Sequence, residues 1–310
     1  MYNFRTDLAS ERRDVYKKAN KLEEIEGIET TNEKFNEDLK VERVKITSEE
    51  AEKIIQKPIG TYVTIDVKDL KVAEEEEIQA AANCVAKELK IIIDTHIDSK
   101  GEILVVGLGN IYVTPDALGP KVVNEIEVTR HIINYMPEYA KEGARKISAI
   151  SPGVLGTTGI ETVEILKGIV DNIHPSLIIV IDALASRSIE RISSTVQISD
   201  TGIVPGAGVG NVRSEISKKT LGVPVVALGI PTVVESAVIV NDSLDLFIGK
   251  LQDEGKSNDY FNELKEKDNY EEIKNALMPN EYNLIVTPKE IDELIENMSQ
   301  IVAAGINNAT

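Results

Sequence analysis

The chain has 310 residues, which is enough for one large α/β domain or for one domain with an appended lobe. Its 52 Asp and Glu residues outnumber its 34 Lys and Arg residues, and the net charge of −18 disfavours direct binding to nucleic acid or to an anionic membrane. The one cysteine excludes a disulfide framework, and we find no apolar run long enough for a signal peptide or a membrane span. The expected location is the cytoplasm.

The N-terminal third of the sequence predicts two strands and one long helix. Residues 1–40 are charged and weakly patterned, so we expect an extended arm with a short helix there. Apolar and polar residues alternate over residues 41–46 and 61–67, as they do in half-buried strands. Residues 74–93 have the period of an amphipathic helix. The positive end of the helix dipole stabilises the glutamates at its start.

Apolar runs separated by helical segments predict a sheet in the rest of the chain. The runs cover residues 102–107, 146–150, 177–182, 192–198, 223–229 and 282–286. Strands that alternate with helices are typical of a three-layer, doubly wound α/β fold with a mostly parallel sheet. Residues 251–281 are polar, charged and rich in helix breakers, so we expect a surface insertion there and not a second core.

Capping patterns predict where three further helices begin. In each pattern a threonine is followed three residues later by a glutamate, so that each side chain can bond to a free backbone N–H of the first turn. The patterns are Thr47 with Glu50, Thr232 with Glu235 after Pro231, and Thr287 with Glu290 around Pro288. We expect a helix to begin directly after each threonine, the first of them ending near Gln56.

The stretch GLGNIYVTPDALGP, residues 107–120, is the centre of our interpretation of the site. It follows an apolar run, and its first two glycines permit a sharp turn because glycine tolerates positive φ. Thr114 and Pro115 then resemble an N-cap and a first helical residue, which would place Asp116 beside the positive end of a helix dipole. Asp116 is either an ordinary residue of a helix start or a functional carboxylate.

A second carboxylate, Asp182, ends the apolar run LIIVID. A carboxylate at the end of a buried strand is costly unless it is paired, hydrogen-bonded or used in chemistry. Asp182 therefore either caps the next loop or belongs to a site. Because ligands bind beyond the carboxyl ends of parallel strands, Asp116 and Asp182 together would form an acid/base pair whose proximity separates their titrations.

Glycine-rich segments near these carboxylates are candidates for a substrate cleft. Asp200-Thr201-Gly202 resembles the signature of pepsin-like aspartic proteases, but that fold is all-β and needs two such loops, so we discount the match. The glycine-rich loop that follows has two possible roles. Its backbone amides bind a carboxylate or a phosphate of the substrate, or it is only a flexible connection. The cleft candidates are Gly107, Gly109, Asn110, Asp200, Gly206 and Gly208.

Other kinds of site have little support in the sequence. A dinucleotide-binding fingerprint fails because its third glycine would fall at Tyr112. The three histidines have no metal-binding spacing, the serines have no G-x-S-x-G elbow, and Cys84 lies away from the strand ends. We therefore expect neither a metal nor a cofactor.

Four sequence blocks occur together along the chain: GLGNIYVTPDALGP, ISPGVLGTTGIET, VIDALASRS and ISDTGIVPGAGVGN. In this order they resemble the spore germination proteases of endospore-forming bacteria, over essentially the whole chain. The resemblance implies an atypical aspartic endopeptidase whose fold is similar to that of the hydrogenase maturation endopeptidases. The two catalytic aspartates of the family map onto Asp116 and Asp182.

The resemblance also implies a substrate and an activation step. The family degrades small acid-soluble proteins that bind spore DNA, and it cuts them after Glu in a segment similar to Thr-Glu-Phe/Ile-Ala-Ser-Glu. Residues 6–11 of this chain, TDLASE, are similar to that segment, and the matching bond is Asp7–Leu8. The resemblance thus implies a zymogen that removes residues 1–7 by self-cleavage, a single peptidase domain at residues 8–310, and homotetramers in the forespore or spore core.

The chemistry that this implies needs one ionised and one protonated carboxylate. The ionised group would activate water as a general base, and the protonated group would act as an acid on the amide. Because a helix dipole favours an ionised carboxylate, we assign Asp116 as the base and Asp182 as the acid. The alternatives are a metal-dependent amidase or peptidase that uses the same carboxylates, and a nonenzymatic module whose glycine loops bind a phosphate ligand.

Overall fold

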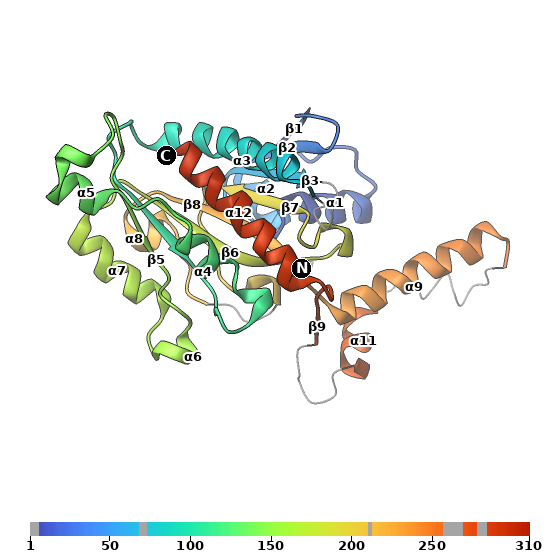
Figure 1. Ribbon diagram of the computed structural model, residues 1–310. Coiled ribbons are helices and arrows are strands. Elements are labelled where there is room, and N and C mark those ends of the chain that lie inside the picture. The colour runs from blue at the N-terminus through green and yellow to red at the C-terminus, as the bar shows by residue number, and fades with distance from the viewer. Residues whose placement is uncertain (1–5, 68–72, 210–212, 257–268, 278–283) are drawn as a thin grey trace.

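The computed structural model describes residues 6–67, 73–209, 213–256, 269–277 and 284–310 (Figure 1). The strands are β1 Ile28–Lys34, β2 Leu39–Ile46, β3 Gly60–Val67, β4 Ile103–Gly107, β5 Ile147–Ile150, β6 Leu177–Ser186, β7 Thr195–Ser199, β8 Val225–Glu235 and β9 Ile285–Val286. The main helices are α1 Ala9–Asn20, α2 Glu49–Ile55, α3 Glu75–His96, α4 Leu118–Asn124, α5 Arg130–Tyr135, α6 Leu155–Thr158, α7 Thr162–Ile173, α8 Lys218–Leu221, α9 Ser236–Asp253, α11 Tyr270–Leu277 and α12 Ile291–Ala309.

These strands form one sheet in the order β1-β2-β3-β7-β8-β6-β4-β5, with β9 added beside β8. The strands β8, β6, β4 and β5 pair in parallel, and their crossover connections contain helices. The strands β1, β2, β3 and β7 pair antiparallel, and β7 joins the two halves by antiparallel pairing with β8. The predicted α/β class is confirmed, and the sheet is mixed because its N-terminal strands and β7 pair antiparallel.

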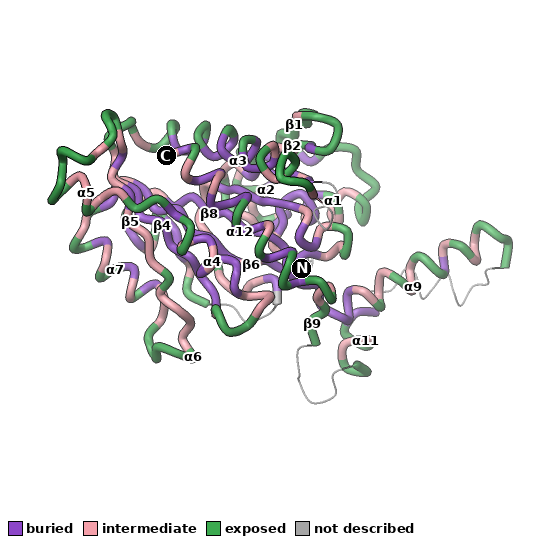
Figure 2. Tube along the Cα trace, in the orientation of Figure 1, coloured by how far each residue is buried: buried purple, intermediate pink, exposed green. Residues whose placement is uncertain are grey.

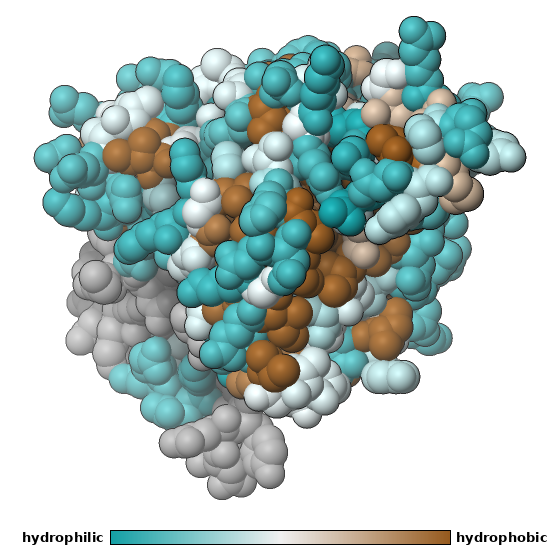
Figure 3. Space-filling model, turned by 90° about the vertical axis from the view of Figure 1, so that its left-hand side faces the viewer, coloured by the Kyte–Doolittle hydropathy of each residue, from teal (hydrophilic) through white to brown (hydrophobic). Residues whose placement is uncertain are grey.

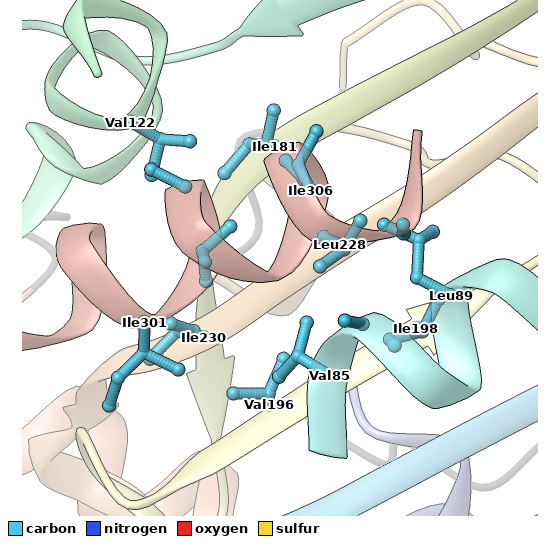
Figure 4. Packing of buried hydrophobic residues seen from close by; sticks show 14 of the residues in the cluster. Val85, Leu89, Val122, Ile181, Val196, Ile198, Leu228, Ile230, Ile301 and Ile306 are labelled. Atoms are coloured by element: carbon cyan, nitrogen blue, oxygen red, sulfur yellow. The ribbon is translucent and has the colours of Figure 1, made fainter. Parts of the chain in front are cut away.

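Helices cover the parallel half of the sheet on both faces, as a doubly wound fold requires. On one face α4 and α12 pack against these strands, and α3, beside α12, covers β3 and β7. Figure 4 shows Ile301 of α12 beside Ile230 of β8, and Val85 of α3 beside Val196 of β7. On the other face α7 and α8 pack against alternate residues of the same strands. Figure 2 shows that the central strands are buried almost throughout, which explains their continuously apolar sequences.

The N-terminal region is more ordered than the sequence pattern predicts. An extended arm was expected over residues 1–40, but β1 pairs with β2 along its whole length, and this part of the prediction is wrong. Six of the seven side chains of β1 are exposed, and its sequence does not alternate between apolar and polar residues. The strand is therefore stabilised mainly by its pairing with β2. Thr6 and Leu8, just before α1, and Ala9, its first residue, are fully excluded from solvent.

All three predicted helix starts are displaced in the structure. The N-cap of α2 is Ser48 and not Thr47, and its hydroxyl accepts the N–H of Ala51 at 3.1 Å. The capping pattern around Thr232 lies within β8, because pairing with β6 and β9 continues that strand to Glu235. The C-terminal helix α12 begins after Glu290.

The region predicted as a surface insertion contains the end of α9 and the helix α11, both of which extend away from the sheet in Figure 1. Residues 257–268 and 278–283 lie outside the described part of the chain, as do two residues of the predicted last strand. The limits of the insertion and of the peptidase domain stay predictions. Among the described helices, none combines the length and the apolar character that crossing a bilayer demands.

Candidate active site

The turn after β4 positions Asp116. Gly109 has a φ of +110°, and a Cβ there would lie 2.0 Å from the carbonyl oxygen of Asp116, so both its backbone and its surroundings require glycine. The N–H of Asn110 donates to Oδ2 of Asp116 at 2.8 Å. Gly107 is needed for another reason, because a Cβ there would lie 2.1 Å from the carbonyl oxygen of Gly119 in α4. The predicted glycine turn is therefore confirmed.

The helix expected at Asp116 is a single 3-10 turn, Thr114–Asp116, with Asp116 as its last residue and Val113 as its N-cap. The carboxylate is half-buried, and this burial raises its pKa above the ordinary value, although the hydrogen bond from Asn110 acts in the opposite direction. The predicted helix start is displaced, because α4 begins only at Leu118, with Ala117 as its N-cap. The ionised state of Asp116 that we expected from a helix dipole stays a prediction.

Asp182 lies within β6 and not at its end. The strand continues to Ser186, and Asp182 is placed between β4 and β8, opposite Gly229 of β8. Its side chain is 6% exposed, and Oδ1 accepts the N–H of Ala183 at 3.0 Å. Burial raises the pKa of Asp182 well above its ordinary value, and the charges of Asp116 and Asp7 raise it further.

One cavity of about 530 Å³ contains both carboxylates. Its lining includes Asp7, Gly109, Asn110, Asp116, Asp182 and Gly206. Gly208 lies next to it, where a Cβ would be 2.3 Å from Oδ2 of Asp7. Gly107 and Asp200 are outside this cavity, and Asp200 instead accepts the N–H of Thr61 at 2.8 Å. The structure thus brings most of the predicted site residues together.

The N-terminal segment, residues 6–11, contacts the same cavity. The hydrophobic pattern of the sequence did not predict this contact. The N–H of Asp7 donates to the carbonyl of Ala185 at 2.9 Å, and the N–H of Ala185 donates to the Asp7 carboxylate at 2.9 Å. On the other side the carboxamide of Gln197 contacts the backbone of Asp7 and Ala9. The segment therefore lies between the end of β6 and the strand β7.

Glu11 fixes the other end of this segment. Its carboxylate accepts the N–H groups of Arg187 at 2.8 Å and Ser188 at 3.1 Å, and it bonds to the hydroxyl of Thr6. The guanidinium of Arg191 lies 3.6 Å away. Such a combination of backbone amides and a cation is a typical environment for a buried carboxylate.

A smaller cavity of about 230 Å³ adjoins Asp7 on the side of Arg12 and Lys57. Desolvation and the charge of Arg12 together lower the pKa of Lys57 to about 8, although the charge of Asp7 acts in the opposite direction. Two basic groups thus lie around the position of the Asp7 side chain. Across the described ranges, no three His, Cys, Asp or Glu side chains are grouped so that they could hold a metal ion.

Comparisons with known proteins identify the family of this chain. A family model described as "Germination protease" matches residues 5–264 and 259–310. A germination protease of Clostridium perfringens (strain SM101) is 48% identical over 315 residues, which cover 100% of this chain and 95% of the relative. A germination protease of Priestia megaterium is 42% identical over 348 residues, with 99% and 94% covered.

A solved structure of the [NiFe] hydrogenase maturation protease HycI from Thermococcus kodakarensis also matches. It is 18% identical with a TM-score of 0.29, and the match covers 46% of this chain and 80% of that one. A score this low adds no argument about the site.

Proposed function

This chain belongs to the germination protease family and is a protease, and we propose that Asp116 and Asp182 are its catalytic pair. The observation that carries the proposal is the shared cavity, in which burial, and in addition the charges of Asp116 and Asp7, favour the protonated form of Asp182. A neutral carboxylic acid beside an ionisable one is the arrangement that general acid/base hydrolysis needs.

In the proposed reaction Asp116 is the base and Asp182 is the acid. Asp116 takes a proton from a water molecule, whose oxygen bonds to the carbonyl carbon of the peptide. Asp182 gives its proton to the amide nitrogen as the C–N bond breaks. The assignment follows from burial, because Asp182 is the more buried of the two and its pKa is raised further by the charge of its neighbour.

We propose that the enzyme is made as a zymogen and first cleaves its own Asp7–Leu8 bond. Asp7 lines the cavity that contains Asp116 and Asp182, and its charge reaches Asp182. Residues 6–11 are held there by backbone bonds and by the contacts of Glu11, as a bound substrate segment would be. The zymogen would therefore carry its first substrate within its own cleft.

The proposed substrates in trans are small acid-soluble DNA-binding proteins of the spore, which would present a segment similar to TDLASE. The enzyme would act in the forespore or spore core as a homotetramer. Apolar side chains gather near the middle of the face shown in Figure 3, on the side of α5 and α7, and such a surface is suited to association. Light scattering should then give about four times the chain mass of 34.0 kDa.

The test uses Asp116→Asn and Asp182→Asn, with Asp171→Asn on the exposed face of α7 as the matched control. A peptide with residues 3–14 of this chain serves as substrate. We expect each dyad variant to fold and to lose at least about 10³-fold in cleavage rate, since each lacks an acid/base group. Cleavage by either variant at the control rate would overturn the pair, and loss of wild-type activity in chelator would favour the metal-dependent alternative.

A further inference from the structure

Gln197 of β7 makes two bonds to the backbone of the N-terminal segment. Its Nε2 donates to the carbonyl oxygen of Asp7 at 3.3 Å, and its Oε1 accepts the N–H of Ala9 at 2.9 Å. The residue is 7% exposed, so these contacts lie away from bulk water. One buried side chain thus uses both its donor and its acceptor on the residues that flank Leu8.

This pattern imitates the pairing of a parallel strand. In a parallel ladder one residue donates to the carbonyl before its partner and accepts from the N–H after it. The carboxamide of Gln197 does the same with Leu8 as the partner, while Ala185 pairs with Asp7. All the groups that Gln197 contacts are main-chain groups, so these contacts do not depend on the side chains of the segment.

We propose that Gln197 is a catalytic residue that polarises the carbonyl of the bond to be cut. This rests on the proposed function, because the Asp7 carbonyl belongs to the bond assigned there as the cleavage site. When water adds to that carbonyl, its oxygen gains negative charge, and a donor already in place stabilises the transition state more than the ground state. The second bond, from the N–H of Ala9, keeps the carboxamide in the orientation that presents Nε2.

The first test measures kcat and KM for the peptide of residues 3–14, together with the rate of self-cleavage. Gln197→Met removes donor and acceptor at similar volume, and Gln197→Glu keeps an acceptor for the N–H but removes the donor. Ser199→Ala, two residues along the same strand, is the control. We expect kcat and self-cleavage to fall about 10²-fold in both Gln197 variants, as for the loss of one oxyanion donor, with KM changed only a few-fold.

The second test separates a direct contact from a structural role. A peptide methylated on the backbone nitrogen that corresponds to Ala9 lacks the N–H that Gln197 accepts. Wild-type enzyme should lose about tenfold in kcat/KM with it, the equivalent of about 1.4 kcal/mol. The Gln197→Met variant should lose little, because the contact is already absent.

Equal losses in both enzymes, or a folded Gln197→Met enzyme with kcat within threefold of wild type, would overturn this inference alone. Failure of wild-type enzyme to cut at Asp7–Leu8 would instead overturn the proposed function, and the role of Gln197 with it. An active Asp182→Asn enzyme would reject the dyad but leave the measurement on Gln197 intact.

Discussion

The two halves of the sheet contribute different things to the site. The parallel half supplies the two carboxylates, because β4 ends beside Ile181 of β6 and the turn after β4 places Asp116 in the same cavity as Asp182. The antiparallel half supplies the surface that holds the N-terminal segment, through Gln197 of β7. Gln197 of β7 is the point where the two halves meet at the site, whereas the outer strands β1 and β2 lie away from it. We infer that these outer strands contribute stability and can be perturbed without changing the chemistry.

After the dyad substitutions themselves, the largest effect should come from Gly109→Ala in the parallel half. The added methyl group would meet the Asp116 carbonyl oxygen at 2.0 Å in a backbone of positive φ, so Asp116 must move. A displacement of about 1 Å in a catalytic group can cost about 10²-fold in rate, and we expect a loss of that size in peptide cleavage. Gly143→Ala, also at positive φ but with nothing within 4 Å, should retain activity. Equal activities would refute the positioning role of the turn.

In the antiparallel half, Arg43→Met should change stability and leave the chemistry alone. Arg43 of β2 makes two bonds, of 2.6 and 2.8 Å, to Glu88 of α3, whose side chain is 2% exposed. The variant leaves a buried carboxylate unpaired, and we expect urea denaturation to show a loss of about 3 kcal/mol in unfolding free energy. Lys87→Met, which removes an exposed partner of Glu33, should cost less than about 1 kcal/mol. A slower kcat in folded Arg43→Met would contradict the separation of the outer strands from the chemistry.

A smaller effect is expected in the pH dependence of stability. The folded-state pKa of Asp182 is raised, so its favourable contribution is complete below the unfolded value of about 3.9 and is lost as pH rises through the folded value. Asp182→Asn should therefore be more stable than wild type at pH 8, by about 1.4 kcal/mol for each unit of pKa shift, with the difference vanishing near pH 4. Urea denaturation from pH 4 to pH 8 measures this difference in unfolding free energy. A difference between the two proteins that does not change with pH would contradict the raised pKa of the buried Asp182.

The sequence allowed much of the parallel half to be predicted. The strands there are apolar throughout, and Asp182 was noticeable because a carboxylate in such a run is costly. The turn at Gly109 was also predictable from the glycines. The raised pKa of Asp116 was not, because a helix-start pattern does not reveal that the carboxylate is half-buried behind a single 3-10 turn.

The antiparallel half was harder to predict, since its contacts depend on residues far apart in the chain. The strand β1 is exposed on most of its length and has no alternating pattern. The role of Gln197 depends on residues nearly 190 positions away, and a single glutamine in an apolar strand gives no sign of them. The one available signal was TDLASE itself, whose likeness to a cleaved segment could have suggested that it lies in the cleft.

The most direct test of the account is the N-terminal sequence of the purified chain after incubation at mildly acidic pH, beside that of Asp182→Asn. We predict a new terminus at Leu8 for wild type and an unchanged Met1 for the variant. A wild-type chain that keeps Met1 while it cuts the peptide, or a variant that acquires Leu8 at the wild-type rate, would contradict it.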